Sequence, residues 1–453
     1  MKYLFPFIVF AALLACSKGP ENNSTSSPLE AKVDSLVKKD IDSVRVAGIA
    51  IGVFKGNQKL LLKSYGYADL EHNVKLPVDA SFEIGSVTKQ FTAVSILQLA
   101  EQGKLSLDDD ISKYVKFDTK GKKVTVRQLL NHTSGIRGYT EMEMFGKLMK
   151  EKHKRDTLLR IVEKEAFDFE PGEALIYNNT AFFIAGLIIE KASGMSYEEY
   201  VSRNLFEKAG MTHSYYCNEQ KVIKNRAHGY DTEGKQLVRA GYLDHTWPYA
   251  AGSLCSTVED LVKWDDALHH GRILSDAMYK EFLTPAVLND GTVGTYAKGI
   301  TVREKNGKRM IEHGGGINGF LSENRYFPDD DLKIVVLVNS TGPVSPDAIA
   351  DFITTQFYPK SKPSYARYDG DFSKFLGSYK GRARGWDATA TVTKNDTTLV
   401  FQWNDKPKPL FYLNGNIWTD GGTKYEFAGN GDAIDRVKVI QDGYGLYVLR
   451  KEK

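Results

Sequence analysis

The feature that most constrains the fold of this chain is an uncharged helical segment, residues 91–100 (Phe-Thr-Ala-Val-Ser-Ile-Leu-Gln-Leu-Ala). Its length and its good helix formers predict a helix, and Gly103 suits the C-terminal cap. A helix with no charged face is typical of a protein interior. We therefore expect the rest of the chain to be organised around this helix.

Ser86 and Lys89 open the helix, directly after an extended segment and Gly85. The two side chains are one turn apart and share a face. A lysine at a helix start lies at the positive end of the helix dipole, and this position together with burial favours the uncharged amine. An uncharged lysine within reach of a serine hydroxyl is a general base. The pattern therefore predicts Ser86 as a nucleophile and Lys89 as its base.

The Ser-x-x-Lys spacing is not specific by itself. Ser35 and Lys38 repeat it, but an apolar stripe through residues 29–41 places both on the solvated face of another helix. A serine at a helix start is also commonly an N-cap. Taken alone, Ser86 therefore leaves a capping role open.

The first residues are typical of a processing signal. Lys2 precedes an apolar run, residues 3–15, that is too short to span a membrane. Leu-Leu-Ala-Cys at residues 13–16 resembles a bacterial lipoprotein cleavage box, which implies lipidation of Cys16; a secretory signal with an incidental cysteine is the alternative. We expect a signal peptide (1–15), a lipidated tether (16–29) and a cell-envelope protein, anchored to a bacterial membrane and facing the periplasm or the exterior.

The other two cysteines are Cys217 and Cys255. An oxidising compartment would allow them to pair, but sequence does not reveal their geometry, and unpaired buried thiols are the preferred interpretation. Neither belongs to a motif with histidine, which disfavours a cysteine nucleophile. The net charge is only +3 and no basic stripe is interleaved with aromatic residues, so we expect no nucleic-acid partner.

Two later motifs place polar groups at the ends of elements. Tyr177 and Asn179 lie just before a second apolar helix, residues 181–192. A nearby cation could lower the pKa of the Tyr177 phenol, and Asn179 offers both a donor and an acceptor. His313 begins a glycine run, residues 313–316, at a strand edge, where a ligand can approach the backbone and find N–H donors. A plain β-bulge is the alternative.

Three other patterns carry no functional prediction. Ser134 lies near His132 but lacks the Gly-x-Ser-x-Gly frame of a nucleophile elbow, so a capped helix end is preferred. The acidic run at residues 108–110 lacks the ligand spacing of a calcium loop. His269 and His270 have no second ligand pair with zinc-like spacing, so we expect no metal site there.

Strand patterns flank the mostly helical middle of the chain. A hairpin is predicted at residues 46–54 and 59–67, further strands lie between residues 300 and 339, and a last helix is predicted at residues 347–357. These patterns predict strands from both ends of one domain with helices between them.

A linker at residues 359–368 precedes a tail, residues 369–453, in which short strands alternate with turns. This spacing is typical of a small antiparallel β-sandwich or barrel. Its aromatic residues predict an apolar core, with a binding face as the alternative. We predict no catalytic constellation in the tail.

Three motifs occur in order: Ser86-x-x-Lys89, Tyr177-x-Asn179 and His313-Gly314-Gly315. Together they resemble the serine β-lactamase and penicillin-binding-protein superfamily, in the class C-like branch that also holds D-alanyl-D-alanine carboxypeptidases, D-aminopeptidases and esterases. The likeness covers roughly residues 30–360. It implies an α/β (α+β) fold of the β-lactamase/transpeptidase type, in which helices and a helical subdomain flank an antiparallel sheet, within a hydrolase domain at residues 30–358.

The resemblance also implies a mechanism. Ser86 would attack an acyl carbonyl while Lys89, with Tyr177 beside it, takes the proton. The N–H groups of Ser86 and Gly316 would form the oxyanion hole, and Tyr177 would protonate the leaving group and later activate water. No metal or organic cofactor is required. The residues expected to bind substrate are Asn179, His313, Gly315 and Gly316.

One departure narrows the expected substrate. Classical β-lactamases and transpeptidases carry Lys-Thr-Gly or a close variant where this chain has His313-Gly314-Gly315. Loss of that cation puts efficient β-lactam hydrolysis in doubt and favours an esterase, a D-amino-acid peptidase or another envelope hydrolase. The expected partner is a small molecule or peptide: a peptidoglycan-type peptide, an ester or a β-lactam.

Two alternatives belong to other classes. One is a non-catalytic envelope protein that keeps the fold as a binding scaffold, because fold alone does not prove activity. The other is a Ser-His-Asp lipase, which the missing Gly-x-Ser-x-Gly frame disfavours.

Overall fold

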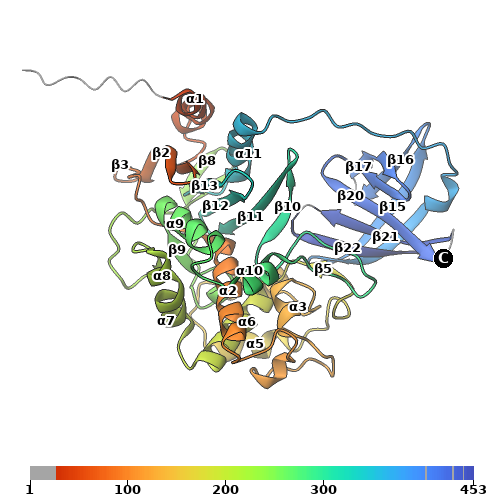
Figure 1. Cartoon of the computed structure of the whole chain (residues 1–453), viewed down its shortest axis with the longest axis horizontal. Helices are drawn as coiled ribbons and strands as arrows, with labels where there is room; N and C mark the ends of the chain where they lie inside the picture. Colours follow the sequence, from red (N-terminus) through yellow and green to blue (C-terminus); the bar gives the residue numbers. More distant parts are fainter. Residues whose placement is uncertain (1–26, 404–405, 431–432, 442, 453) are drawn as a thin grey trace, which may run out of the picture.

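The computed structural model describes residues 27–403, 406–430, 433–441 and 443–452 (Figure 1). The predicted signal peptide and Cys16 lie outside these residues. Within the described part of the chain, no helix combines the length and the apolar character that crossing a membrane requires.

A seven-stranded antiparallel sheet forms the centre of the larger part of the molecule. Its order is β10-β11-β12-β13-β1-β2-β3. The strands are β1 (Gly48–Lys55), β2 (Gln58–Asp69), β3 (Val74–Lys75), β10 (Thr301–Lys305), β11 (Lys308–Ile317), β12 (Phe320–Phe327) and β13 (Leu332–Val338). The two ends of the domain meet where β1 pairs with β13, from Ile49 opposite Val338 to Lys55 opposite Leu332. The predicted mixing of N-terminal and C-terminal strands in one sheet is confirmed.

Both faces of this sheet are covered. Successive β13 residues point to opposite faces, so Ile334 and Val336 join the core under α1 (Pro28–Asp42) and α11 (Pro346–Phe357). Val335 and Leu337 join the larger core on the other side. Burial on both faces explains why β13 is apolar throughout rather than alternating.

The uncharged segment forms α2 (Thr88–Glu101), in which every residue from Thr88 to Leu99 is buried. The helix lies against α6 (Asn179–Ser193), the second predicted apolar helix, which ends at Gly194 in the left-handed conformation. The remaining helices are α3 (Val126–Leu130), α4 (Glu143–Leu148), α5 (Arg155–Val162), α7 (Tyr197–Val201), α8 (Glu207–Ala209), α9 (Val258–His269) and α10 (Asp276–Leu283).

Short strands interrupt this helical region. They are β4 (Phe82–Glu83), β5 (Leu175–Ile176), β6 (Tyr215–Tyr216), β7 (Tyr230–Glu233), β8 (Gln236–Arg239) and β9 (Leu254–Ser256). The sequence did not predict the β7–β8 hairpin, which lies where a mostly helical run was expected.

The tail forms an antiparallel barrel-like sheet that is nearly closed. Its strands are β14 (Gly377–Ala383), β15 (Trp386–Asn395), β16 (Thr398–Trp403), β17 (Lys406–Pro409), β18 (Phe411–Asn414), β19 (Ile417–Thr419), β20 (Thr423–Asn430), β21 (Ala433–Gln441) and β22 (Gly445–Lys451). β17 pairs with β16 and β18 pairs with β19, so one chain segment joins the two ends of the sheet. The predicted aromatic core is present, with Trp418 and Tyr425 buried.

The barrel is joined to the larger part by main-chain pairing. β5, from the predicted hydrolase domain, pairs with β22, with Ile176 opposite Gly445. The two parts thus share a sheet, and the exact domain boundaries at residues 358 and 369 stay a prediction.

The preference for unpaired thiols is wrong, because Cys217 and Cys255 form a disulfide. β9 pairs with β6, which places Tyr215 opposite Cys255. The Cα atoms of Cys217 and Cys255 lie 5.3 Å apart, well within the range for a disulfide. This pairing joins residues 38 positions apart and has no local sequence signature.

Replacing both cysteines (Cys217→Ala with Cys255→Ala) should lower the free energy of unfolding by about 2–4 kcal/mol, because the bridge restricts the unfolded chain. Urea unfolding of a soluble form starting at Ser17 measures this loss. In the same form, alkylation after denaturation should add no mass unless a reductant is present; alkylation of both thiols without reductant would contradict the bridge.

Candidate active site

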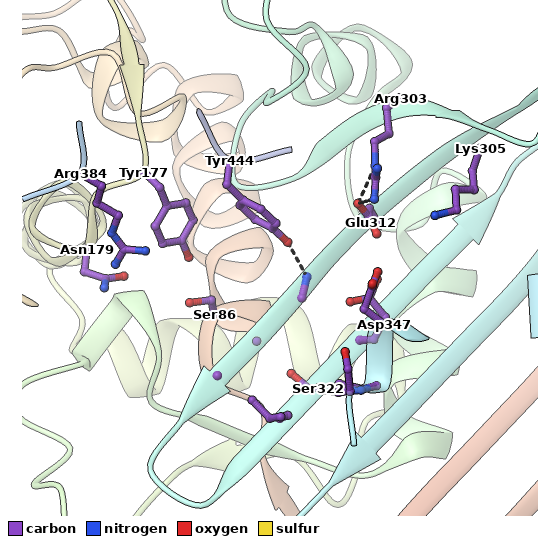
Figure 2. A pocket seen from close by; sticks show the side chains of 17 residues that line it. Ser86, Tyr177, Asn179, Arg303, Lys305, Glu312, Ser322, Asp347, Arg384 and Tyr444 are labelled. Carbon is purple, nitrogen blue, oxygen red and sulfur yellow. Dashed lines mark hydrogen bonds and ion pairs between the residues drawn. The ribbon is translucent and has the colours of Figure 1, made fainter. Parts of the chain in front are cut away.

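A cleft of about 710 Å³ opens beside Ser86. Figure 2 shows Ser86 close to Tyr177, with Asn179 to one side and β11 running past them. Gly315 and Gly316 of β11 also line the cleft. The structure thus brings five of the seven predicted catalytic and substrate-binding residues to one cavity; their roles stay predictions.

Lys89 lies directly beneath Ser86. Ser86 is in a single 3-10 turn (Gly85–Val87) that leads into α2, and Lys89 is the second residue of α2. The Lys89 Nζ lies 3.1 Å from Ser86 Oγ, 2.8 Å from Asn179 Oδ1 and 2.8 Å from the Ala251 carbonyl oxygen. The Lys89 side chain is completely buried.

All three partners of Lys89 are uncharged. Burial lowers the pKa of Lys89 well below its usual 10.5, and the Arg384 guanidinium lowers it further. An uncharged amine has two N–H donors and one lone pair. The oxygens of Asn179 and Ala251 only accept, so they take both donors, and the lone pair is left for the hydroxyl proton of Ser86. This arrangement is that of a general base with its nucleophile.

Tyr177 follows β5 and is buried beside both groups. Its hydroxyl points toward Ser86 (Figure 2) and makes no well-formed hydrogen bond with the described residues. The Lys89 Nζ lies 4.7 Å from the ring centroid. Burial raises the pKa of Tyr177, and the lowering by Ser86 and Arg384 is smaller. A nearby cation, Arg384, does lower this pKa as predicted, but burial outweighs it and the Tyr177 phenol is neutral.

The glycine run lies within β11 and passes against the Ser86 turn. A Cβ atom on Gly315 would lie 2.2 Å from the Ile84 carbonyl oxygen and 3.1 Å from the Ser86 nitrogen. Gly85 has a φ of 49°, and a Cβ atom on it would lie 2.9 Å from the Gly316 nitrogen. Only glycine permits this approach, which brings the backbone of the Ser86 turn next to Gly316 at the cleft.

His313 does not line the cleft. Its Nδ1 donates to the Gly314 carbonyl oxygen at 2.6 Å, which leaves Nε2 to accept from the Tyr296 hydroxyl at 2.8 Å. Burial lowers the pKa of His313 to about 3. The imidazole is therefore neutral and supports the aromatic wall behind Tyr177, a position that does not favour direct substrate binding.

Among the cleft residues that sequence reasoning missed, two come from the tail. Arg384, in the turn between β14 and β15, lies with its Cζ 5.0 Å from the Tyr177 ring centroid. Tyr444, just before β22, accepts a hydrogen bond from the Gly314 N–H at 2.9 Å. The tail therefore lines part of the cleft, which agrees with the binding face that the sequence left as an alternative. No local motif marks either residue.

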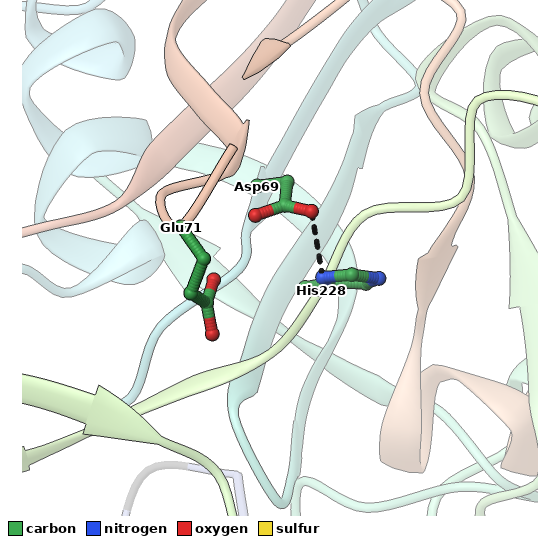
Figure 3. Close-up of side chains that lie close together, drawn as sticks. All are labelled: Asp69, Glu71 and His228. Atoms are coloured by element: carbon green, nitrogen blue, oxygen red, sulfur yellow. Dashed lines mark ion pairs between the residues drawn. The ribbon is translucent and has the colours of Figure 1, made fainter. Parts of the chain in front are cut away.

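Four groups of acidic and histidine side chains in the described residues have metal-like spacing, and each already faces a cation. In the group of Figure 3, His228 pairs with Asp69 at 3.3 Å. Arg239 reaches both Glu71 and His228. In the other three groups, Glu83 faces Arg226, Asp266 faces Lys333 and Glu323 faces Arg325. These contacts identify ion-pair clusters rather than cation sites.

The chain matches known proteins along most of its length. Residues 33–356 match the protein-family model described as Beta-lactamase. Protein flp of Staphylococcus aureus (strain MRSA252) is 27% identical over 380 residues, which cover 82% of this chain and 72% of that protein.

Two solved structures are similar. The octameric penicillin-binding protein homologue from Pyrococcus abyssi has a TM-score of 0.65 and 26% identity, covering 92% of this chain and 99% of that one. The D-amino acid amidase from Ochrobactrum anthropi SV3 has a TM-score of 0.64 and 23% identity, and the match covers 73% of this chain and 99% of the amidase chain. At this level of identity, the similarity to the amidase shows that the two proteins share a fold.

The rate at which a fluorophosphonate labels Ser86 should fall as the pH falls through the lowered pKa of Lys89, because a protonated Lys89 accepts no proton. In Arg384→Gln this acid limb should move to higher pH, because the variant lacks a cation that lowers the pKa of Lys89. Labelling rates across pH measure the shift. Arg450→Gln, which removes an exposed arginine paired with Glu173, is the control and should leave the limb in place. An unmoved limb in Arg384→Gln would refute the electrostatic coupling.

Gly315→Ala should slow Ser86 labelling by roughly tenfold to a hundredfold, because the new methyl group forces β11 away from the Ser86 turn. Single-turnover labelling with a fluorophosphonate gives the rate, and thermal unfolding checks the fold. Gly146→Ala, whose Cβ would meet nothing within 4 Å, is the matched control. Equal labelling by both variants would show that the close approach is dispensable.

Proposed function

The chain belongs to the beta-lactamase family, and from this premise we propose that it is a serine hydrolase that cleaves a small ester or amide through an acyl-enzyme. The observation that carries the proposal is the buried, uncharged Lys89, whose third hydrogen-bond partner is the hydroxyl of Ser86. A structural lysine would be expected to have an acidic partner or access to water.

In the proposed mechanism each group has one role. Ser86 Oγ forms a bond to the acyl carbon while its proton passes to Lys89. The N–H groups of Ser86 and Gly316 stabilise the oxyanion. The bond to the leaving oxygen or nitrogen then breaks as that atom receives a proton through the neutral Tyr177. Water attacks the acyl-enzyme with the same groups acting in reverse, and Ser86 regains its proton.

The cleft and the relatives both support a class of substrate for this proposal. A neutral, enclosed His313 supplies no cation on β11. This supports a small ester, a D-amino-acid amide or a D-peptide over a β-lactam antibiotic. The similarity to a D-amino acid amidase and to a penicillin-binding protein homologue supports the same range.

Location in the cell envelope remains part of the proposal. The Cys217–Cys255 disulfide supports an oxidising compartment outside the cytoplasm. The lipoprotein-like sequence ending at Cys16 supports attachment to a membrane through a lipid.

The test is the intact mass of a soluble form starting at Ser17 after exposure to a fluorophosphonate and, separately, to a penicillin. We expect a fluorophosphonate adduct that is absent from Ser86→Ala. A lasting penicilloyl adduct would identify a penicillin-binding peptidase, and turnover of penicillin would identify a β-lactamase. If penicillin gives neither an adduct nor turnover, the protein is an esterase or a D-aminopeptidase. An unmodified wild-type protein in both reactions would favour the non-catalytic binding scaffold.

A further inference from the structure

The β barrel contributes side chains to the cleft, and its position there is fixed by several contacts. Pairing of β22 with β5 holds Tyr444 and Tyr177, the residues directly beyond the paired ends of the two strands, next to each other, with ring centroids 5.5 Å apart. The β14–β15 turn that carries Arg384 is fixed by Asp168, which accepts from Arg137 and Arg382 at 2.8 Å each. Arg384 is therefore held in place by the main chain around it as well as by its own contacts.

Only part of the Arg384 guanidinium is used within the protein. Its Nε and Nη2 both contact Oε1 of Glu141, each at 2.6 Å. Among the described residues, Glu141 is the acidic side chain with which Arg384 pairs. No contact of Nη1 with another described residue accompanies these two, Arg384 lines the cleft, and its side chain is 40% exposed.

A chain of hydrogen bonds fixes Arg384 relative to the reacting groups. Glu141 accepts from the Thr140 hydroxyl at 2.8 Å, and Thr140 accepts from Asn179 Nδ2 at 3.1 Å. Asn179 Oδ1 in turn accepts from Lys89. Arg384 is thus connected to Lys89 through three side chains. The last of these, Asn179, is one of the residues predicted to bind substrate.

The other cations of the cleft lie farther along the strands and face carboxylates. Figure 2 shows Arg303 beside Glu312, away from Ser86, with Lys305 nearby. Arg303 contacts Glu312 at 2.8 Å, and Lys305 contacts Asp351 at 2.7 Å. At the Ser86 end of the cleft, Arg384 is the cation placed to meet an anionic substrate.

Tyr444 limits the length of that substrate. Beyond the end of β10, β11 is an edge strand, and an extended peptide could pair with its free N–H groups. The Tyr444 hydroxyl already accepts the hydrogen bond of the Gly314 N–H, so this group is not available to a peptide. The contact favours a short leaving group over a long peptide lying along β11.

From these contacts we propose that Arg384 of the barrel binds a free carboxylate in the leaving group of the substrate, one residue from the bond that Ser86 cleaves. The proposal rests on the hydrolase function above. The leaving-group side is indicated because Arg384 packs over Tyr177, the group that protonates the leaving atom. A planar guanidinium with one side open matches a carboxylate. The protein then selects acyl compounds that end in a single carboxylate-bearing unit.

The test compares two thioesters, N-benzoyl-D-alanyl-thioglycolic acid and its thioglycolate methyl ester, which share the reacting bond and differ in the leaving-group carboxylate. In Arg384→Gln, KM for the acid should rise roughly tenfold or more, because a charge-assisted hydrogen bond is lost, while KM for the methyl ester stays within about twofold. The kcat values should change little. Rates are taken on the pH plateau of each variant.

Three comparisons make the result decisive. Arg384→Lys should recover part of the preference for the acid, and Arg450→Gln should behave as wild type. Equal losses for acid and methyl ester in Arg384→Gln would overturn the proposal and identify Arg384 as a positioning residue for the barrel. No change for either substrate would also overturn it.

Failure of the proposed function gives a different result. Fluorophosphonate carries no carboxylate, so it labels Ser86 in the wild type and in Arg384→Gln if the hydrolase function holds. If neither thioester turns over, equilibrium binding of the same two compounds to Ser86→Ala provides the same comparison. Equal affinity of that protein for acid and methyl ester would overturn the carboxylate assignment.

Discussion

The site depends on one physical constraint, the burial of an uncharged lysine amine against a serine hydroxyl. An ammonium in this position would lose its hydration without gaining a counter-ion, so the neutral form is favoured. The neutral amine must still have its two donors satisfied, and they reach Asn179 at the start of α6 and the Ala251 carbonyl. The start of α2, the start of α6 and the turn at Ala251 must therefore meet within a few ångströms. The element that makes this meeting possible is α2, which is buried from Thr88 to Leu99.

The tail completes the site although it is remote in sequence. Pairing with β22 adds β5 to the barrel sheet, and Tyr177 is the residue directly after β5. The position of the barrel and the position of Tyr177 are therefore linked. The same docking brings Arg384 to the Tyr177 ring and Tyr444 to β11. The barrel thus forms one wall of the cleft. This arrangement gives the tail a physical role in substrate choice that its own strand pattern does not reveal.

The parts that sequence predicted are those governed by local periodicity or by a short motif. The β1–β2 hairpin, the α2 and α6 helices and the strands from β10 to β13 follow from patterns of a few residues, as does the placement of Ser86 beside Lys89. The disulfide, the role of Arg384 and the capping of Gly314 by Tyr444 depend on contacts between segments far apart in the chain. Tyr177 is a third kind of case: its place near Ser86 and Lys89 was foreseeable, but its pKa depends on how completely the phenol is enclosed and on Arg384 of the tail.

The location of the cation on a separate domain has a structural reason. β11 must pass so close to the Ser86 turn that a single methyl group at Gly315 does not fit, and its neighbour His313 is enclosed and neutral. A long cationic side chain replacing that imidazole would meet Tyr296 and the aromatic wall behind Tyr177. A cation delivered by the β14–β15 turn approaches from the open side of Tyr177 instead. The strand that shapes the oxyanion site and the residue that selects the leaving group are then separate, so either can change without displacing the other.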